Sequence, residues 1–273
     1  MGTRPAHFIS DPDGMFHPTE NARSRWGGDD MLNGPAVVSL AAFNLEQRFG
    51  LPEFLPARLT VDLFKAARRV PTTVRSRLIR DGRRIRNSEC DVMQGDVIVA
   101  RATLVQYRLS EPPPGDEWFA HAEFTPPPSD GEQHGFFIGS DDVGWRADGG
   151  AHQNTSRKRV YHSPIDVVAG HDITPPFVRT VVVAEATSLV SNLGTKGIGY
   201  INGDLTVALS RLPESEHIGV QGDSHWVSDG ISVGTGTLFD SVGPFGTGLV
   251  TAIANPAAQI DFSAPDSIPT LSV

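Results

Sequence analysis

Cysteine is nearly absent from this chain of 273 residues, which contains only Cys90. One cysteine can form neither an internal disulfide nor a cysteine-based metal cluster, and a reducing compartment is then the default. No apolar stretch approaches the length of a membrane span, and the first residues, MGTRPAHFIS, lack the apolar core of a signal peptide. We therefore expect a cytoplasmic protein without a membrane span.

Positive charge is also in short supply. The chain has 23 Lys and Arg against 32 Asp and Glu, which gives a net charge of −9. Such a balance argues against general affinity for nucleic acids or anionic membranes, so we expect no nucleic-acid partner. Charged residues at 20% and hydrophobic residues at 39% are typical of a globular protein.

One sequence feature occurs twice. The run Leu-Thr-Val-X-Leu begins at Leu59 and again at Leu205, 146 positions later. An Asp-Gly turn follows each copy, at residues 81–82 and 229–230, and a second turn and a small or apolar run come after each. Four ordered features at nearly one offset indicate a duplicated unit, and the period is too long for a solenoid repeat. The sequence therefore predicts two tandem copies of one domain.

Each copy has a helix-like segment followed by four strand-like segments. The first helix is expected over residues 34–49, with Asn33 as N-cap and Gly50 as its end. The second is expected over residues 180–193, although three consecutive valines leave a strand as an alternative. A further strand is expected before each helix. One helix on one antiparallel sheet is an α+β layout. The predicted strands cover residues 58–64, 72–80, 83–93 and 97–108 in the first copy, and 199–211, 216–228, 231–240 and 246–254 in the second.

The domain boundaries follow from composition. We expect an N-terminal domain over residues 1–110, a Pro- and Gly-rich linker over 111–155, a C-terminal domain over 156–256 and a loose tail over 257–273. The linker is expected to be irregular or flexible. Its histidines are His121, His134 and His152; no pair has metal-ligand spacing, so we expect solvated side chains and no metal site.

The layout resembles the double hotdog fold, in which a long helix is wrapped by a meandering sheet twice in one chain. The stretches GRRIRNSECDVMQGDVIVARATLVQY and GIGYINGDLTVALSRLP, with FHPTENARSRW and LNGPAVVSLAAFNLE, are similar to the TesB-like (type II) acyl-CoA thioesterases in their actinobacterial form. The resemblance covers both halves and leaves out the linker. It implies hydrolysis of a thioester by water, without a covalent nucleophile and without a cofactor.

The resemblance also implies site residues. The family's helix carboxylate is an Asp after an Ala, and Glu185 follows Ala184 here. The water-positioning residues of the two following strands, often Thr and Gln, fall on Asn202 and Thr251. The family's His-Gly-Gly stretch falls on Leu32-Asn33-Gly34, where Asn33 and Gly34 would bind the thioester carbonyl at a helix N-terminus. Glu185, Asn202 and Thr251 are all polar, yet none of them is the family's usual residue.

The same residues have plainer explanations. Glu185 is the only ionisable residue from Thr180 to Thr195, so it is either a solvated helix residue or a partly buried base with a raised pKa. Asn202 beside Gly203 suits a backbone-capping turn, and Thr251 suits an ordinary sheet surface. Asn33 is expected to cap a helix whether or not it also contacts substrate.

Arginines gather in one part of this acidic chain. Ten of the 23 Lys and Arg lie between Arg58 and Arg86, and several flank the first Asp-Gly turn. Arg83 and Arg84, at that turn, are candidates to bind the phosphates of coenzyme A. The alternative is a solvated sheet face with ion pairs.

Three functions fit these features. The first is an acyl-CoA thioesterase that acts on an acyl-CoA substrate. The second is a catalytically degenerate acyl-CoA or acyl-chain binding protein on the same fold, and the third is a hotdog hydratase. In each case we expect a homo-oligomer, because the family stacks its double hotdogs and sheet edges or faces would otherwise stay unpaired.

Overall fold

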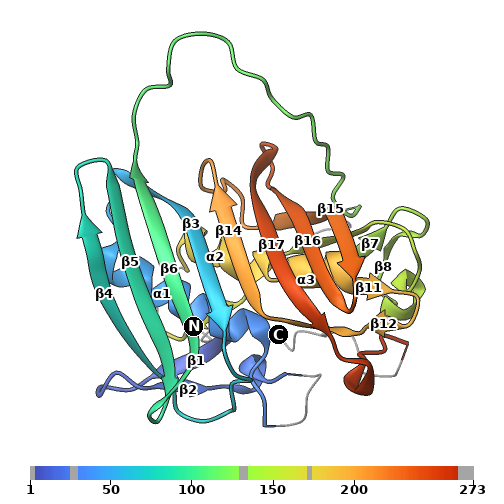
Figure 1. Ribbon diagram of the computed structural model, residues 1–273, viewed down its shortest axis with the longest axis horizontal. Helices are drawn as coiled ribbons and strands as arrows, with labels where there is room; N and C mark the ends of the chain where they lie inside the picture. Colours follow the sequence, from blue (N-terminus) through green and yellow to red (C-terminus); the bar gives the residue numbers. More distant parts are fainter. Residues whose placement is uncertain (1–3, 25–29, 129–134, 171–173, 264–273) are drawn as a thin grey trace.

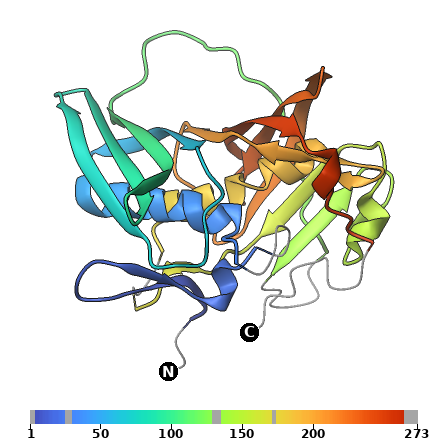
Figure 2. The ribbon, with the colours of Figure 1, turned by 60° about the horizontal axis from the view of Figure 1, so that its bottom comes forward.

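The computed structural model describes residues 4–24, 30–128, 135–170 and 174–263. Within them, one long antiparallel sheet curves around central helices that lie on its concave side (Figures 1 and 2). The strand order of this sheet is β4-β5-β6-β3-β14-β17-β16-β15-β9-β7-β8, and β13 pairs with β17 beside that path. No helix among the described residues is long and apolar enough to cross a membrane.

The N-terminal half matches its predicted elements closely. Helix α1 occupies Gly34–Phe49, with Asn33 as its N-cap and Gly50 as its C-cap. Four strands form its sheet, and each boundary lies within four residues of the prediction, because turn residues separate the strands. They are β3 (Phe54–Leu63), β4 (Thr73–Asp81), β5 (Ile85–Gln94) and β6 (Val97–Arg108).

The C-terminal half repeats this meander but breaks its helix. The single helix predicted over residues 180–193 is wrong in detail, and so is the strand alternative: α2 covers Pro176–Ala184 and α3 covers Thr187–Asn192. Two short strands follow α3 before the meander begins. The strands are β11 (Leu193–Gly194), β12 (Gly197–Ile198), β13 (Tyr200–Asn202), β14 (Asp204–Leu209), β15 (Ile218–Ser228), β16 (Ile231–Phe239) and β17 (Pro244–Ala254).

The two halves meet at β3 and β14, and the register there confirms the duplication. Thr60 lies opposite Thr206, its own equivalent 146 positions later, and the two hydroxyl oxygens are 3.1 Å apart. Leu59 lies opposite Val207, and Val61 lies opposite Leu205, as a twofold axis between the two threonines requires. The strand order β3-β6-β5-β4 on one side therefore repeats as β14-β17-β16-β15 on the other.

The predicted strand before each helix is present in both halves. In the first half it is β2 (Phe16–Pro18), which meets β4 through the bridge from Phe16 to Thr72. In the second half it is β9 (Lys158–His162), which pairs with β15. A small second sheet in the order β10-β1-β2 joins the halves, because β1 of the N-terminal half pairs with β10, just ahead of α2. These strands are β1 (Ala6–Ser10) and β10 (Asp166–Val168), and the short helix η1 (Glu20–Ala22) lies near them.

The linker has more regular structure than the sequence predicted. Strands β7 (Phe136–Ser140) and β8 (Gly144–Arg146) extend the large sheet beyond β9, and the short helix η2 (Gly149–His152) follows. The solvated state expected for His152 is wrong, because its side chain is buried and bonds the Ser140 hydroxyl and the carbonyl of Arg146. His134 lies outside the described residues.

The first part of the linker runs outside the sheet from β6 to the C-terminal half (Figure 1). Phe124 anchors it there: its ring stacks on Phe239 and Tyr161 and covers Gly219, where a Cβ atom would lie 2.5 Å from the ring. The described part of the tail is also held, contrary to the prediction. Ile260 bridges to Ile198, and the Phe262 side chain is buried. A last short helix, η3, covers Pro256–Ala258. Residues 264–273 lie outside the described part.

Candidate active site

The N-terminus of α1 meets the end of α2, and the contact there is between Gly34 of the first half and Glu185 of the second. A Cβ atom on Gly34 would lie 2.1 Å from Oε1 of Glu185, so the carboxylate occupies the space that any other residue at position 34 would fill. Helices α1 and α2 pack against each other along this contact. The sequence-predicted pair of Gly34 and Glu185 is therefore brought together, although 151 positions separate the two residues.

The cap of α1 leaves one backbone donor at this point. The Asn33 Oδ1 accepts the N–H of Ala36 at 2.8 Å, and its Nδ2 donates to the carbonyl of Asn21 at 2.9 Å. Pro35 has no N–H. No acceptor in the described part of the chain bonds the N–H of Gly34. Asn33 is thus a cap, as expected, and the Gly34 amide is the group of the pair that remains able to bind a carbonyl oxygen beside the Glu185 carboxylate.

Glu185 stands at the break between α2 and α3. The N–H of Ala186 bonds the carbonyl of Val183 at 3.0 Å, and the N–H of Ser188 bonds the carbonyl of Glu185 at 3.1 Å. These three-residue spacings are tighter than those of an α-helix and are common at functional positions. The break turns the residue out of the regular helix.

Burial changes the acidity of this carboxyl group. Glu185 is half-buried, and no hydrogen bond or ion pair reaches its side chain from the described residues. Loss of solvation raises the pKa of Glu185 from 4.5 to about 8. A carboxylate with such a pKa is a far stronger base than an ordinary Glu and is still ionised in part near neutral pH.

Asn202 is connected to the helix after Glu185 by one hydrogen bond. Its Oδ1 accepts a hydrogen bond from the Ser188 hydroxyl at 2.8 Å, and Ser188 follows Glu185 by three positions on α3. Residues three apart share one side of a helix, so Ser188 connects the Glu185 side of α3 to β13. The sequence analysis missed Ser188, although its spacing from Glu185 was a usable signal.

Thr251, for which the resemblance implied a role in positioning water, does not join this group in the structure. Its hydroxyl donates to Oδ2 of Asp204 at 2.8 Å, and its N–H donates to Oδ1 of the same carboxylate at 2.8 Å. Along β17 the buried residues Gly248, Val250 and Ala252 face the helices, so Thr251 faces the opposite side of the sheet. The next residue, Ala252, lies opposite Asn202 and shares its face.

The arginine-rich hairpin is remote from Glu185. Arg86 donates to the carbonyl of Phe49 at 2.6 Å, which fixes the hairpin at the C-terminal end of α1. A helix of 16 residues is about 24 Å long, so this end is far from Gly34. Arg83 and Arg84 are exposed at the turn. Other members of the cluster form the ion pairs of the alternative explanation: Arg75 with Asp91, Arg77 with Glu89, and Arg86 with Asp81.

Within the described residues, no group of three or more His, Cys, Asp or Glu side chains could hold a metal ion. Cys90 is buried, and burial raises the pKa of its thiol to about 12, so it is no candidate nucleophile. The site at the helix junction therefore consists of a basic carboxylate, a backbone donor and an oriented amide.

Comparison with known families identifies the family of this chain. The model of the acyl-CoA thioesterase N-terminal domain matches residues 22–107, and the model of the C-terminal domain matches residues 109–251. The chain belongs to the acyl-CoA thioesterase family. It is a thioester hydrolase, as the sequence resemblance implied. No curated protein sequence gave a match.

Solved structures confirm the double hotdog fold. The acyl-CoA thioesterase II TesB2 from Mycobacterium marinum is 14% identical, with a TM-score of 0.65, and the match covers 91% of this chain and 94% of that one. The tesB protein from Mycobacterium avium subspecies paratuberculosis is 13% identical, with a TM-score of 0.62, and 91% and 96% are covered. A hot dog protein from Alicyclobacillus acidocaldarius is 15% identical, with a TM-score of 0.62, and 92% and 96% are covered.

Proposed function

We propose that this protein hydrolyses acyl-CoA thioesters with a water molecule that Glu185 activates. The observation that supports this most is the contact between the Glu185 carboxylate and Gly34, the first residue of α1. It puts a basic group beside a backbone N–H at a helix N-terminus. A thioester carbonyl bound to that N–H would be within reach of water held by the carboxylate.

The proposed reaction needs no covalent enzyme intermediate. Glu185 removes a proton as the water oxygen attacks the thioester carbon, and the carbonyl oxygen becomes negative beside the Gly34 N–H and the positive end of α1. The tetrahedral intermediate then collapses, and the bond from carbon to sulfur breaks. The proton held by Glu185 passes to the departing thiolate, so the products are a carboxylic acid and free coenzyme A.

Asn202 has the role of holding the water. Because the Ser188 hydroxyl donates to its Oδ1, the amide is oriented with its two N–H groups directed away from Ser188. An N–H of this amide can donate to the water oxygen and leave both water hydrogens available to the Glu185 carboxylate. Ser188 acts through Asn202 and is a positioning residue.

The exposed pair Arg83 and Arg84 is proposed to contact coenzyme A phosphates. The distance along α1 from Gly34 means that only the nucleotide end of the coenzyme, or that of a molecule bound across an oligomer, can reach them. Their exposure leaves both guanidinium groups accessible to such a ligand.

We also propose a cytoplasmic homo-oligomer. Ile253 lies opposite Ile231 on one side and Ile201 on the other, and all three are more than half exposed, so adjacent strands present an apolar strip on the sheet's outer face. Light scattering should report an assembly larger than one chain, and Ile253→Lys should reduce its size. A monomer at all concentrations would contradict the proposal.

Substitution of Glu185 tests the catalytic proposal. Glu185→Gln keeps the size of the side chain but removes the base, so turnover of an acyl-CoA that the wild type hydrolyses should fall by about 10²–10⁴-fold. Acyl-CoA binding should stay similar. Glu185→Asp restores the residue usual in the family and should retain more activity than the Gln variant.

Two outcomes would contradict the proposal. Equal turnover by the wild type and Glu185→Gln would remove Glu185 from the mechanism. A wild type that binds acyl-CoA but hydrolyses none of a broad panel, measured by release of free thiol, would favour the acyl-CoA binding protein instead.

A further inference from the structure

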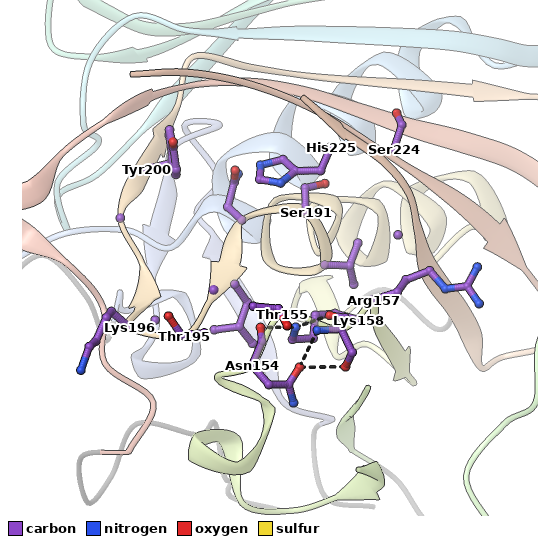
Figure 3. A pocket seen from close by; sticks show the side chains of 18 of the residues that line it. Asn154, Thr155, Arg157, Lys158, Ser191, Thr195, Lys196, Tyr200, Ser224 and His225 are labelled. Atoms are coloured by element: carbon purple, nitrogen blue, oxygen red, sulfur yellow. Dashed lines mark hydrogen bonds between the residues drawn. The ribbon is translucent and has the colours of Figure 1, made fainter. Parts of the chain in front are cut away.

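A cavity of about 700 Å³ lies at the far end of α3 from Glu185. Its walls come from the end of α3, the start of β9, the middle of β15 and the first residue of β13 (Figure 3). In this view Tyr200 and His225 lie on one side of the end of α3, and Asn154 and Lys158 lie on the other. Gly34, Glu185 and Asn202 do not line it, so the cavity is distinct from the proposed reaction site.

The charge of the cavity is opposite to that of the whole protein. Arg157, Lys158 and Lys196 line it, and Asp223 is the single carboxylate among its lining residues. The chain as a whole has a net charge of −9. A positive cavity in an acidic protein attracts an anionic ligand.

Lys158 is the most unusual of these cations. Its side chain is 2% exposed, yet no carboxylate in the described part of the chain forms an ion pair with it. The ammonium group donates to the carbonyls of Asn154, at 2.9 Å, and Ser156. An ammonium group has three donors, so one is left after these two bonds. Two carboxylates, Asp142 and Asp141, act on it electrostatically without an ion-pair contact, and Asp141 is already paired with Arg157 and Arg159. A buried charge without an ion-pair partner is costly, and an anion in the cavity would reduce that cost.

Asn192, which also lines the cavity, carries a second unsatisfied donor. Its side chain is 4% exposed, and its Nδ2 has no partner among the described residues. Its Oδ1 accepts the Ser232 hydroxyl at 2.6 Å, and the Ser232 oxygen lies 3.1 Å from Nε2 of His225. Because the Ser232 hydroxyl donates to Asn192, its oxygen accepts from Nε2 of His225, and burial lowers the pKa of that imidazole. This chain of donors fixes the Asn192 amide and leaves its N–H groups for a ligand.

Two elements, α3 and β13, carry residues of both the reaction site and the cavity. On α3, Ser188 belongs to the reaction site and Asn192 to the cavity, about 6 Å further along the helix. On β13, Tyr200 and Asn202 are two positions apart, so they share one face of the strand and lie about 7 Å from each other. Val190 and Leu193 also line the cavity and provide apolar surface for methylene groups. The separation of the two sites therefore matches the length of a short acyl chain.

We infer that this cavity receives the far end of the acyl group and that this end is a carboxylate. The substrate class is then an ω-carboxyacyl-CoA, whose methylenes contact Val190 and Leu193 and whose carboxylate binds Lys158 and Asn192. The inference rests on the proposed hydrolysis at Glu185 and adds the chemistry of the acyl group.

Matched substrates test it. Glutaryl-, adipoyl- and suberoyl-CoA differ from valeryl-, hexanoyl- and octanoyl-CoA by a terminal carboxylate. Hydrogen bonds to a charged group are worth about 1.5–3 kcal/mol, so the wild type should prefer the carboxylated member of at least one pair by roughly 10–100-fold in kcat/KM. Lys158→Met should abolish this preference and leave hydrolysis of the neutral substrate within about threefold. The ratio of two substrates in one enzyme sample does not depend on how much of the variant folds.

Asn192→Leu provides a second test with no change of charge, and Lys65→Met, at an exposed lysine of the first half, is the matched control. Asn192→Leu should reduce the preference, and Lys65→Met should retain it. A wild type that prefers the neutral member of every pair would overturn the inference while leaving the thioesterase proposal intact. A preference that Lys158→Met leaves unchanged would also overturn it. Hydrolysis of neither member of any pair would instead be a failure of the proposed function.

Discussion

The starts of α1 and α2 are equivalent positions in the duplicated fold, but only one of them has the groups that the proposed reaction needs. Helix α1 begins with Asn33 as a bonded cap and Gly34 against the Glu185 carboxylate. Helix α2 begins with Pro175 and Pro176, and its cap has no side-chain hydrogen bond. Two prolines remove two backbone donors, so the second helix start offers little to a carbonyl oxygen.

The helices that face these two starts also differ from each other. The helix that faces the start of α1 is broken at Glu185, whereas α1 is continuous. The first carboxylate of α1 is Glu46, in its last turn. The two junctions are equivalent by duplication, but only one of them combines a free backbone donor, a carboxylate and a break in the facing helix. An asymmetric substrate needs only one such junction.

A pair of substitutions at the two helix starts should separate these junctions most strongly. Gly34→Ala places a Cβ atom where Glu185 Oε1 lies and must displace the carboxylate. Misplacement of a reacting group by about 1 Å can cost 10²-fold, so we expect kcat to fall by roughly 10–100-fold. Pro176→Ala, at the equivalent start of α2, should change kcat by less than about twofold. Steady-state kinetics measures both, and similar losses in the two variants would remove the proposed asymmetry.

The two faces of the C-terminal sheet provide a finer comparison. Asn202→Ala removes the amide on the helix side and should lower kcat by about tenfold. Thr251→Val removes a hydroxyl on the other side, where it bonds Asp204. It should cost about 1 kcal/mol of stability in denaturant unfolding and leave kcat within about twofold. A larger loss of kcat from Thr251→Val than from Asn202→Ala would reverse our assignment of the two faces.

The arginine pair should have the smallest effect. Charge reversal at Arg83 and Arg84 should raise KM for acyl-CoA by a few-fold and leave kcat unchanged. The effect is small because each exposed arginine contributes to binding only about as much as a surface ion pair. Added salt should weaken wild-type binding by a similar factor and affect the variant less. An unchanged KM together with salt-independent binding would return the pair to ordinary solvated surface.

The sequence predicted the strands well because turn residues separate them. The Asp-Gly turn at residues 229–230 has positive φ at both positions, 50° and 77°, as a tight hairpin requires, and the strands on either side follow directly. The same reasoning missed β7 and β8, because the apolar run at residues 136–138 is short and lies among Gly, Pro and Asp residues that suggest a loop.

The site was harder to predict than the fold. The helix break at Glu185 has no Gly or Pro to mark it, so the apolar run around it suggested one continuous helix. Thr251 was harder for another reason: successive strand residues face opposite sides, and an error of one position reverses the face. Nothing in the run GLVTAIA distinguishes Thr251 from Ala252 in this respect. Glu185 was a candidate because it is the only ionisable residue in its apolar run and falls where the resemblance implies a helix carboxylate.

The ionisation of Glu185 has two consequences with opposite dependence on pH. Its pKa in the folded protein is raised above the ordinary value of 4.5, so it stabilises the fold most below that pH and loses this contribution as pH rises through about 8. Its activity as a base increases over the same range, because only the ionised form accepts a proton. A loss of activity at lower pH is therefore not explained by the effect of this group on stability.

The pH dependence of kcat/KM for a hydrolysed acyl-CoA is the most direct test of the account. For the wild type, we predict a rise with pH that levels off above an apparent pKa of about 8, the value to which burial raises the pKa of Glu185. The residual activity of Glu185→Gln should lack this rise. A wild-type profile that is flat between neutral pH and about pH 9, or the same rise in Glu185→Gln, would contradict the claim that the buried carboxylate is the base.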